Sequence, residues 1–283
     1  MSSLSAGRAL KMGLLQALSL WPAALLLFLV SAVEVFAGFL IPLGIGAWLF
    51  GADQALVPAL GAWFAVWLGA QVLRVLVQGG AVRQGGRLWK GEPPGALSAQ
   101  ALAASPRSLS YLCWMVPIDL LALGWRWVAL LAAGWAYGRA FAEGEGGFFA
   151  AGSLAAALVL GLFLGLVTGT WKRAALVRAI HHDQGVLGSL YDAACALCVR
   201  LWPHLLLVVV FGLIALVGEA TFSSMASLVI RPVPGELPPL MLGLAGQLVA
   251  GLLGSFVSAI VELAALQGFL ALALDERHEL PAA

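Results

Sequence analysis

Long runs of apolar residues alternate with short polar segments along the chain, and about six of these runs are long enough to cross a membrane. A helix of about 20 apolar residues spans the roughly 30 Å of bilayer hydrocarbon. Helices are expected because they satisfy their backbone hydrogen bonds within one segment. The predicted spans are residues 19–48, 55–80, 110–138, 148–172, 202–228 and 239–272. The expected fold class is an all-α integral membrane protein, with residues 1–283 forming a single polytopic domain.

Composition supports lipid as the surrounding solvent. The chain is 62% hydrophobic and 10% charged, whereas an average soluble domain is about 25% charged. The net charge of +1 gives no broad basic face, so a nucleic-acid partner is not expected. The first apolar run, Leu14 to Phe50, is far longer than a signal-peptide core, which predicts a retained membrane helix.

Orientation follows from the distribution of Lys and Arg, which favour the cytoplasmic side. One set of connections holds most of these residues: Arg8, Lys11, Arg83, Arg87, Lys90, Arg107, Lys172, Arg173, Arg178, Arg200 and Arg277. The opposite set holds only Arg139 and Arg231. Both termini are therefore predicted in the cytoplasm. The outer loops are too short to form a folded external domain.

The second helix of each predicted pair carries small residues at every fourth position, which puts them on one face and allows close helix packing. These stripes are Gly61, Ala65 and Gly69; Gly161, Gly165 and Gly169; and Ala250, Gly254 and Ser258. Nine residues after each stripe comes a polar side chain: Gln78, Arg178 or Gln267. A threefold parallel repeat is predicted, with units of about 7–92, 95–187 and 188–279.

The first helix of each pair also shares features. Trp21-Pro22 and Trp202-Pro203 begin two of the spans, and Trp114 and Pro117 lie near the start of a third. Tryptophan suits the membrane interface, and proline in a first helical turn costs no hydrogen bond. Before each start lies a segment that predicts an amphipathic linker helix along the cytoplasmic surface. These segments are 7–20, 96–111 and 188–200.

Three helix pairs with cytoplasmic linkers resemble uncharacterised bacterial six-helix inner-membrane families. They include the YciC-like group and the membrane domain found with some glycerophosphodiester phosphodiesterases. The resemblance spans most of the chain and rests on layout, on the Trp-Pro pairs and on the small-residue stripes. The phosphodiesterase catalytic domain is missing from this sequence, so no activity carries over. The resemblance implies a multi-pass protein of the bacterial cytoplasmic membrane, linked to envelope or lipid processes.

Ionisable residues inside spans are costly and suggest function. The intramembrane polar candidates are Glu34, Asp119, Arg126, Glu219 and Glu262. Arg126 should pair, by depth, with Glu34 first or Asp119 second. Arg74 is expected to extend its charge to the interface. Three interpretations stay open: ion pairs that fix helix packing, a solute or proton pathway, and side chains that face interfacial water.

Metal binding and catalysis have weak signals. His181, His182, Cys195 and Cys198 offer the ligand types of a tetrahedral zinc site, but small cysteines in an apolar segment are more often ordinary packing residues. The expectation is no resident metal and no cofactor. No motif places a catalytic nucleophile, and the Gly-x4-Gly-Lys-Ser/Thr phosphate-binding pattern is missing.

These patterns favour a non-enzymatic membrane protein: a scaffold, an accessory subunit or a lipid-associated module. Its expected partners are the lipid bilayer and either other proteins of a membrane complex or further copies of the chain. The alternative is a transporter or channel-like component that uses the intramembrane acids and Arg126. A third reading, an intramembrane enzyme acting on lipid, would depend on His181, His182 and Asp183.

Overall fold

The computed structural model describes residues 6–38, 44, 56–142, 147–229 and 239–276. The helices in these residues are α1 (Ala6–Ser19), α2 (Trp21–Gly38), α4 (Leu56–Trp89), α5 (Leu97–Ala142), α6 (Gly147–His181), α7 (Val186–Val199), α8 (Leu201–Val229) and α9 (Pro239–Glu276). The described part of the chain contains no strand. The prediction of an all-α protein is therefore confirmed at the level of fold class.

Four helical stretches among the described residues are long and apolar enough to cross a membrane. They are Trp21–Gly38, Val57–Trp89, Leu201–Phe222 and Leu248–Glu276. Helices α5 and α6 coincide with the other two predicted spans, but most side chains of their apolar stretches lie outside the described residues. These apolar helices show a membrane-embedded protein.

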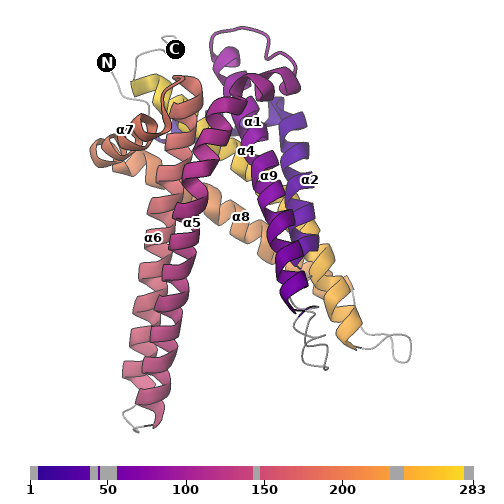
Figure 1. Ribbon diagram of the computed structural model, residues 1–283, viewed down its shortest axis with the longest axis vertical. Helices are drawn as coiled ribbons and strands as arrows, with labels where there is room; N and C mark the ends of the chain where they lie inside the picture. Colours follow the sequence, from indigo (N-terminus) through magenta and orange to yellow (C-terminus); the bar gives the residue numbers. More distant parts are fainter. Residues whose placement is uncertain (1–5, 39–43, 45–55, 143–146, 230–238, 277–283) are drawn as a thin grey trace.

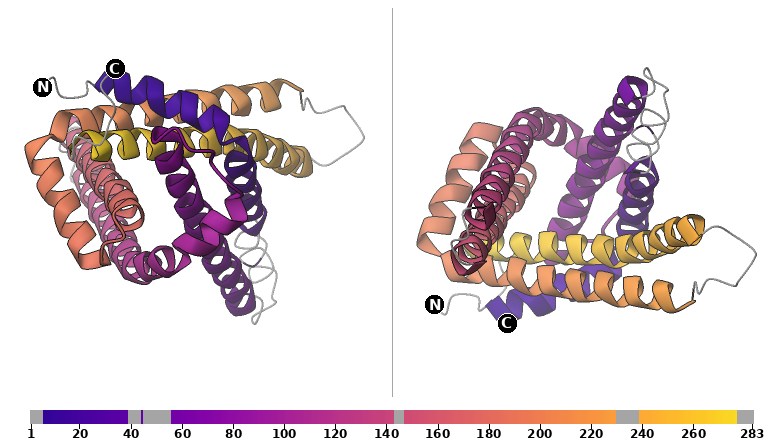
Figure 2. Two further views of the ribbon diagram at one scale, coloured as in Figure 1. Left: turned by 90° about the horizontal axis from the view of Figure 1, so that it is seen from above. Right: turned by 90° about the horizontal axis from the view of Figure 1, so that it is seen from below.

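Consecutive long helices lie side by side as pairs: α2 with α4, α5 with α6, and α8 with α9. The three pairs meet at one end of the molecule, where α1 and α7 also lie, and diverge toward the other (Figure 1). Seen along the long axis, the pairs point in different directions (Figure 2). Helix α9 is the common neighbour, because α1, α2, α4, α6 and α8 all contact it.

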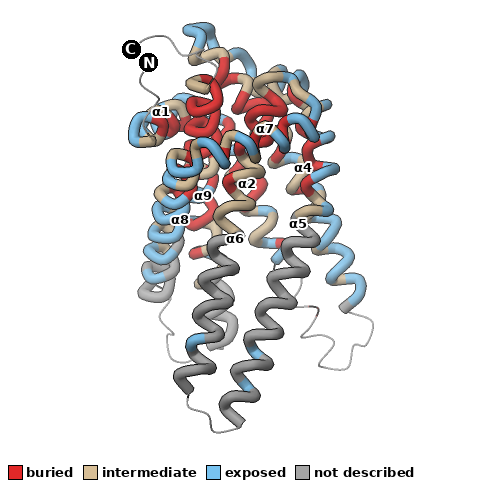
Figure 3. The backbone as a smooth tube through the Cα atoms, turned by 90° about the vertical axis from the view of Figure 1, so that its left-hand side faces the viewer, coloured by how far each residue is buried: buried red, intermediate tan, exposed pale blue. Residues whose placement is uncertain are grey.

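The buried core is concentrated at the end where the pairs meet, which we call the hub (Figure 3). We define the hub as α1, α7, residues 259–276 of α9 and the parts of α4, α5, α6 and α8 packed on them. From Leu263 to Leu274 every residue of α9 is buried. Away from the hub, large apolar side chains such as Leu29 and Phe64 are exposed.

A short break in the helix separates each of two linker helices from the span that follows it. Helix α1 ends at Ser19 and α2 begins at Trp21, which puts Pro22 in a first turn. Helix α7 ends at Val199, Arg200 leaves helical geometry at φ −129° and ψ 50°, and α8 begins at Leu201 with Pro203 in its first turn. In both places the proline needs no intrahelical partner for its nitrogen. The predicted linker helices 7–20 and 188–200 are confirmed as separate helices.

The third predicted linker, 96–111, is not a separate helix. It continues without interruption into the following span as α5, with Pro106 and Pro117 inside the helix. A proline inside a helix removes one hydrogen bond but does not force a chain reversal. The turn before α5 instead uses Gly91 and Gly95, with φ of 73° and 74°, a backbone conformation that favours glycine.

Candidate functional site

A polar cluster joins α2, α4 and α9 inside the candidate spans. We call it the inner cluster, and its members are Ser31, Glu34, Gln71, Arg74, Gln78 and Glu262. Nη2 of Arg74 lies 2.6 Å from Oε2 of Glu34 and donates to the Ser31 hydroxyl at 2.9 Å. Gln71 donates to the other oxygen of Glu34 at 2.7 Å. Since both oxygens of Glu34 accept bonds from α4, the cluster fixes α2 to α4.

Glu262 brings α9 into the inner cluster. Its Oε1 accepts a hydrogen bond from Gln78 and lies 3.8 Å from Nε of Arg74. The side chains of Arg74, Glu34 and Glu262 are 21%, 20% and 16% exposed. In these ion pairs one guanidinium faces two carboxylates. With both ionised, the three groups carry an excess negative charge where solvent screening is weak.

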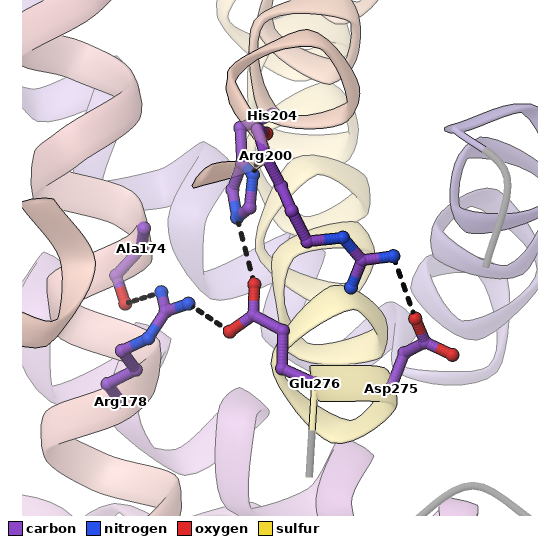
Figure 4. Close-up of polar contacts among 6 residues, drawn as sticks. All are labelled: Ala174, Arg178, Arg200, His204, Asp275 and Glu276. Carbon is purple, nitrogen blue, oxygen red and sulfur yellow. Dashed lines mark hydrogen bonds and ion pairs between the residues drawn. The ribbon is translucent and has the colours of Figure 1, made fainter. Parts of the chain in front are cut away.

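A second polar cluster lies at the end of α9 and joins α6, α8 and α9 (Figure 4). We call it the hub cluster. Arg178 of α6 donates to Oε2 of Glu276 and, at 3.3 Å, to the carbonyl of Ala174. Arg200 donates to Asp275 at 3.0 Å. The side chain of Arg178 is only 5% exposed, so its charge depends on Glu276 for compensation.

His204 completes the hub cluster with a fully buried ring that packs against Phe269, with ring centroids 5.7 Å apart. Its Nδ1 lies 2.8 Å from the carbonyl oxygen of Arg200 and must be the donor, because a carbonyl oxygen only accepts. Its Nε2 is 3.8 Å from Oε1 of Glu276, beyond hydrogen-bond distance. His204 therefore ties the start of α8 to the break at Arg200 (Figure 4).

Two of the five predicted intramembrane candidates, Glu34 and Glu262, meet in the inner cluster. The side chains of Asp119, Arg126 and Glu219 lie outside the described residues. The expected partner of Glu34 was Arg126, but the structure places Arg74 on Glu34. Arg74, whose charge was expected to extend to the interface, pairs with Glu34 of α2 and Glu262 of α9.

The predicted packing stripe on α4 does not pack against another helix among the described residues. Gly61, Ala65 and Gly69 are exposed, and a Cβ on either glycine would meet no atom within 4 Å. On α9, Ala250 and Gly254 are buried but Ser258 is exposed. On α6, Gly165 and Gly169 are half-buried, and the surroundings of Gly161 lie outside the described residues.

The closest helix contacts occur at other small residues, all in the hub. A Cβ on Gly13 would overlap the carbonyl oxygen of Ala264 and sit 3.0 Å from the backbone nitrogen of Gly268, so α1 and α9 touch through their backbones. A Cβ on Gly85 would overlap Gln267, whose amide donates to the Ala81 carbonyl at 3.0 Å. The spacing of small residues in the sequence does not identify Gly13 and Gly85 as contact positions; their burial in the structure does.

The polar residues that follow each stripe take part in bonds between helices. Gln78 bonds Glu262, Arg178 bonds Glu276, and Gln267 bonds the Ala81 carbonyl. Each bond has one partner on α9. The sequence drew attention to these positions, but it gave no role to Glu276, Asp275 or His204. The sequence feature that could have indicated this role is the acidic pair Asp275-Glu276 at the end of an apolar helix.

The four residues considered for zinc do not form a metal site. Among the described residues, no group of three or more His, Cys, Asp or Glu side chains is placed to hold a metal ion. Cys195 and Cys198 are exposed on α7, so they are not the buried packing residues that the sequence favoured. His181 and His182 contact each other edge to face, with ring centroids 4.9 Å apart.

Three further hydrogen bonds hold the linker segments in the hub. Arg107 of α5 donates to the side chain of Asp183 at 3.0 Å and to its backbone carbonyl at 2.8 Å. Trp171 of α6 donates to the carbonyl of Leu190 at 2.9 Å, which fastens α7 to α6. The turn before α7 and α7 itself are thus fixed to the α5–α6 pair.

Comparison of this chain with protein-family models, with curated proteins and with solved structures gave no match.

Proposed function

We propose that this chain is a non-enzymatic scaffold or accessory subunit of the bacterial cytoplasmic membrane. In this proposal six helices cross the membrane as three pseudo-repeated pairs, and both termini lie in the cytoplasm. The hub is then the cytoplasmic end, in agreement with the excess of Lys and Arg in the connections there. Other membrane proteins bind the diverging helix pairs.

The observation that carries the proposal is the position of the charges. The described ion pairs of the inner cluster and the hub cluster join neighbouring helices to one another, and α9 takes part in both clusters. A carboxylate and a guanidinium that pair inside a bundle fix the positions of the helices that carry them. This geometry favours a structural role for Glu34, Arg74 and Glu262.

The proposal is tested by the size of the assembly. The chain is extracted from its native membrane directly into lipid nanodiscs, and the mass of the particle is measured by native mass spectrometry. A scaffold or accessory subunit is expected to remain bound, in fixed ratio, to other polypeptides, giving a protein mass well above its own 29.4 kDa. A single chain alone in the disc would contradict the proposal.

Matched variants connect this assembly to the hub. Arg178→Ala removes the buried partner of Glu276 and is expected to release the bound polypeptides, because it loosens α6 from α9. Arg87→Ala removes an equal charge from an exposed pair with Glu92, whose side chains are 38% and 51% exposed, and should leave the assembly intact. Equal loss in both variants would contradict a role for the hub.

A second candidate function, a proton-linked transporter component, is favoured by one observation: two carboxylates share Arg74. A site with one carboxylate in excess is suited to take up a proton. Glu262→Gln would then abolish proton-coupled flux into liposomes, whereas a scaffold would show no flux in either form. Flux that is lost in Glu262→Gln but retained in the exposed-site variant Glu92→Gln would select the transporter.

A further inference from the structure

Helix α1 turns its small residues inward and its large apolar residues outward. Ala9, Gly13 and Ala17 are buried against the hub, whereas the outward face carries three exposed leucines. These are Leu14, Leu15 and Leu18, at 39%, 57% and 66% exposure. In water the opposite arrangement would be expected, because a leucine gains far more than an alanine from burial. An apolar medium therefore covers this face.

Helix α7 has the same arrangement on its own outer side. Its inward residues, among them Leu190 and Leu197, are buried. Its exposed residues recur at intervals of three or four and share one face: Leu187, Tyr191, Cys195 and Cys198, with Val199 beside them. The phenol of Tyr191 donates a hydrogen bond to Cys195, one turn on, and this bond raises the pKa of Tyr191. The residues named on this face are uncharged, and the half-buried Asp192 lies at its edge.

Both outward faces continue into the exposed surface of the candidate spans. Trp21, at the start of α2, is 64% exposed, and Trp202, at the start of α8, is 77% exposed. Beyond them, exposed leucines run along each span, at Leu25 and Leu29 on α2 and at Leu206 on α8. Trp21 and Trp202 lie where α1 and α7 join the spans, and tryptophan favours the membrane interface. The lipid that surrounds the spans therefore also contacts the outward faces of α1 and α7.

The two helices differ in charge. The outer side of α1 also carries exposed basic side chains, Arg8 and Lys11, one to two turns before the leucines. A helix with leucines and basic residues on its exposed side is typical of one that lies in the interface of an acidic membrane. The outward residues of α7 named above include no basic side chain.

We infer that α1 and α7 lie in the plane of the membrane surface with their outward faces in the boundary between headgroups and acyl chains, and that α1 selects acidic phospholipids. This inference rests on the proposed function in placing the hub at the cytoplasmic leaflet. The ligand class is an anionic phospholipid such as phosphatidylglycerol, held by leucine insertion and by the basic side chains of α1.

The immersion of both helices is tested with spin labels on the full chain in nanodiscs. Cys113, Cys195 and Cys198 are exposed and are all replaced by Ser to give a cysteine-free background. Each labelled variant then has one cysteine: either the native Cys195 is kept, or Leu18→Cys is introduced. Leu29→Cys is the control within a span, and Glu92→Cys is the control in an exposed turn. Accessibility to oxygen, which concentrates in lipid, is compared with accessibility to a neutral nickel chelate, which stays in water.

The labels at Leu18→Cys and Cys195 are expected to collide more with oxygen than with nickel, as at Leu29→Cys, and Glu92→Cys should show the reverse. Nickel-accessible labels on α1 and α7 would overturn the inference while leaving the spans intact. Labels shielded from both reagents would show a protein partner on these faces and would also overturn it. A nickel-accessible Leu29→Cys would instead contradict the membrane-spanning arrangement itself.

Selection of acidic lipid is tested with the same Leu18→Cys label in discs of phosphatidylcholine, with and without phosphatidylglycerol. Phosphatidylglycerol should lower nickel accessibility, and Lys11→Gln should weaken the underlying equilibrium about fivefold, the factor expected for one lysine at an acidic surface. Lys90→Gln, an equal change of charge at an exposed turn residue, should have no effect. Equal effects of the two variants, or none from phosphatidylglycerol, would overturn the selectivity.

Discussion

The hub and the diverging ends of the helix pairs are built from similar apolar residues but are packed differently. In the hub, Leu266 and Leu270 of α9 are fully buried. Farther along the pairs, Leu60 and Phe64 of α4 are 41% and 42% exposed, although α4 is also apolar enough to span a membrane. Burial of apolar surface stabilises only where water is the alternative, and lipid is as apolar as leucine. The chain thus builds a water-excluding core at one end and leaves its spans to the lipid.

The two polar clusters follow the same division. In the hub cluster the almost fully buried Arg178 forms an ion pair with Glu276. The inner cluster is more open, and its carboxylates are each bonded to more than one group. The hub should therefore respond to mutation more strongly than any other described region.

The largest expected effect is that of Arg178→Ala. Loss of one partner leaves Glu276 without its compensating charge, which typically costs about 3–5 kcal/mol of unfolding free energy. Arg87→Ala breaks an exposed pair and should cost no more than about 1 kcal/mol. Unfolding in mixed micelles, followed by tryptophan fluorescence, measures both. Similar values for the two variants would remove the distinction between the hub and the surface.

A comparison within one helix separates packing from lipid contact. Leu27 of α2 is fully buried, and Leu27→Ala should cost about 2–5 kcal/mol of unfolding free energy. Leu29, two residues on, is 49% exposed, and Leu29→Ala should cost less than about 0.5 kcal/mol. The same unfolding measurement applies. A large loss at Leu29 would show that another protein surface covers that face.

The smallest effect concerns two glycines of different surroundings. A methyl group on Gly13 would meet the backbone of α9, which cannot move aside as a side chain can, so Gly13→Ala should cost about 1–3 kcal/mol. Gly69→Ala adds the same methyl group in open space and should be neutral, or stabilising by up to about 1 kcal/mol through helix propensity. The aggregation temperature of each purified variant would rank their stabilities. A lower temperature for Gly69→Ala than for Gly13→Ala would indicate that the predicted stripe on α4 is a contact face.

Much of the fold follows from the sequence because hydrocarbon restricts a chain so strongly. The apolar runs predicted the helices, and Trp21-Pro22 and Trp202-Pro203 marked the starts of α2 and α8 within one residue. The continuous α5 was not predicted, since Pro106 and Pro117 suggest a break that the helix tolerates. Six spans, the threefold repeat and the orientation of the termini stay predictions.

The partners of the charges could not be predicted from depth alone. Glu34 and Arg126 stand at similar depths in their spans, but which helices are neighbours decides the pairing, and α4 rather than α5 packs on α2. The spacing of small residues gave a wrong contact face for the same reason, because it does not show which helices are neighbours. Gly61 and Gly69 have the spacing of a contact face, but Gly13, outside any stripe, packs directly against the backbone of α9.

The contact of α1 with α9 has a consequence for biogenesis. A ribosome makes α1 before every other described helix and α9 after all of them, so α1 leaves the exit tunnel long before its docking surface exists. The surface of α9 around Gly268, on which Gly13 packs, forms only when the last pair has been inserted. Until then the leucine face of α1 can lie on the bilayer surface. The packing of α1 on α9, which completes the hub, is therefore a late step in the folding of the chain.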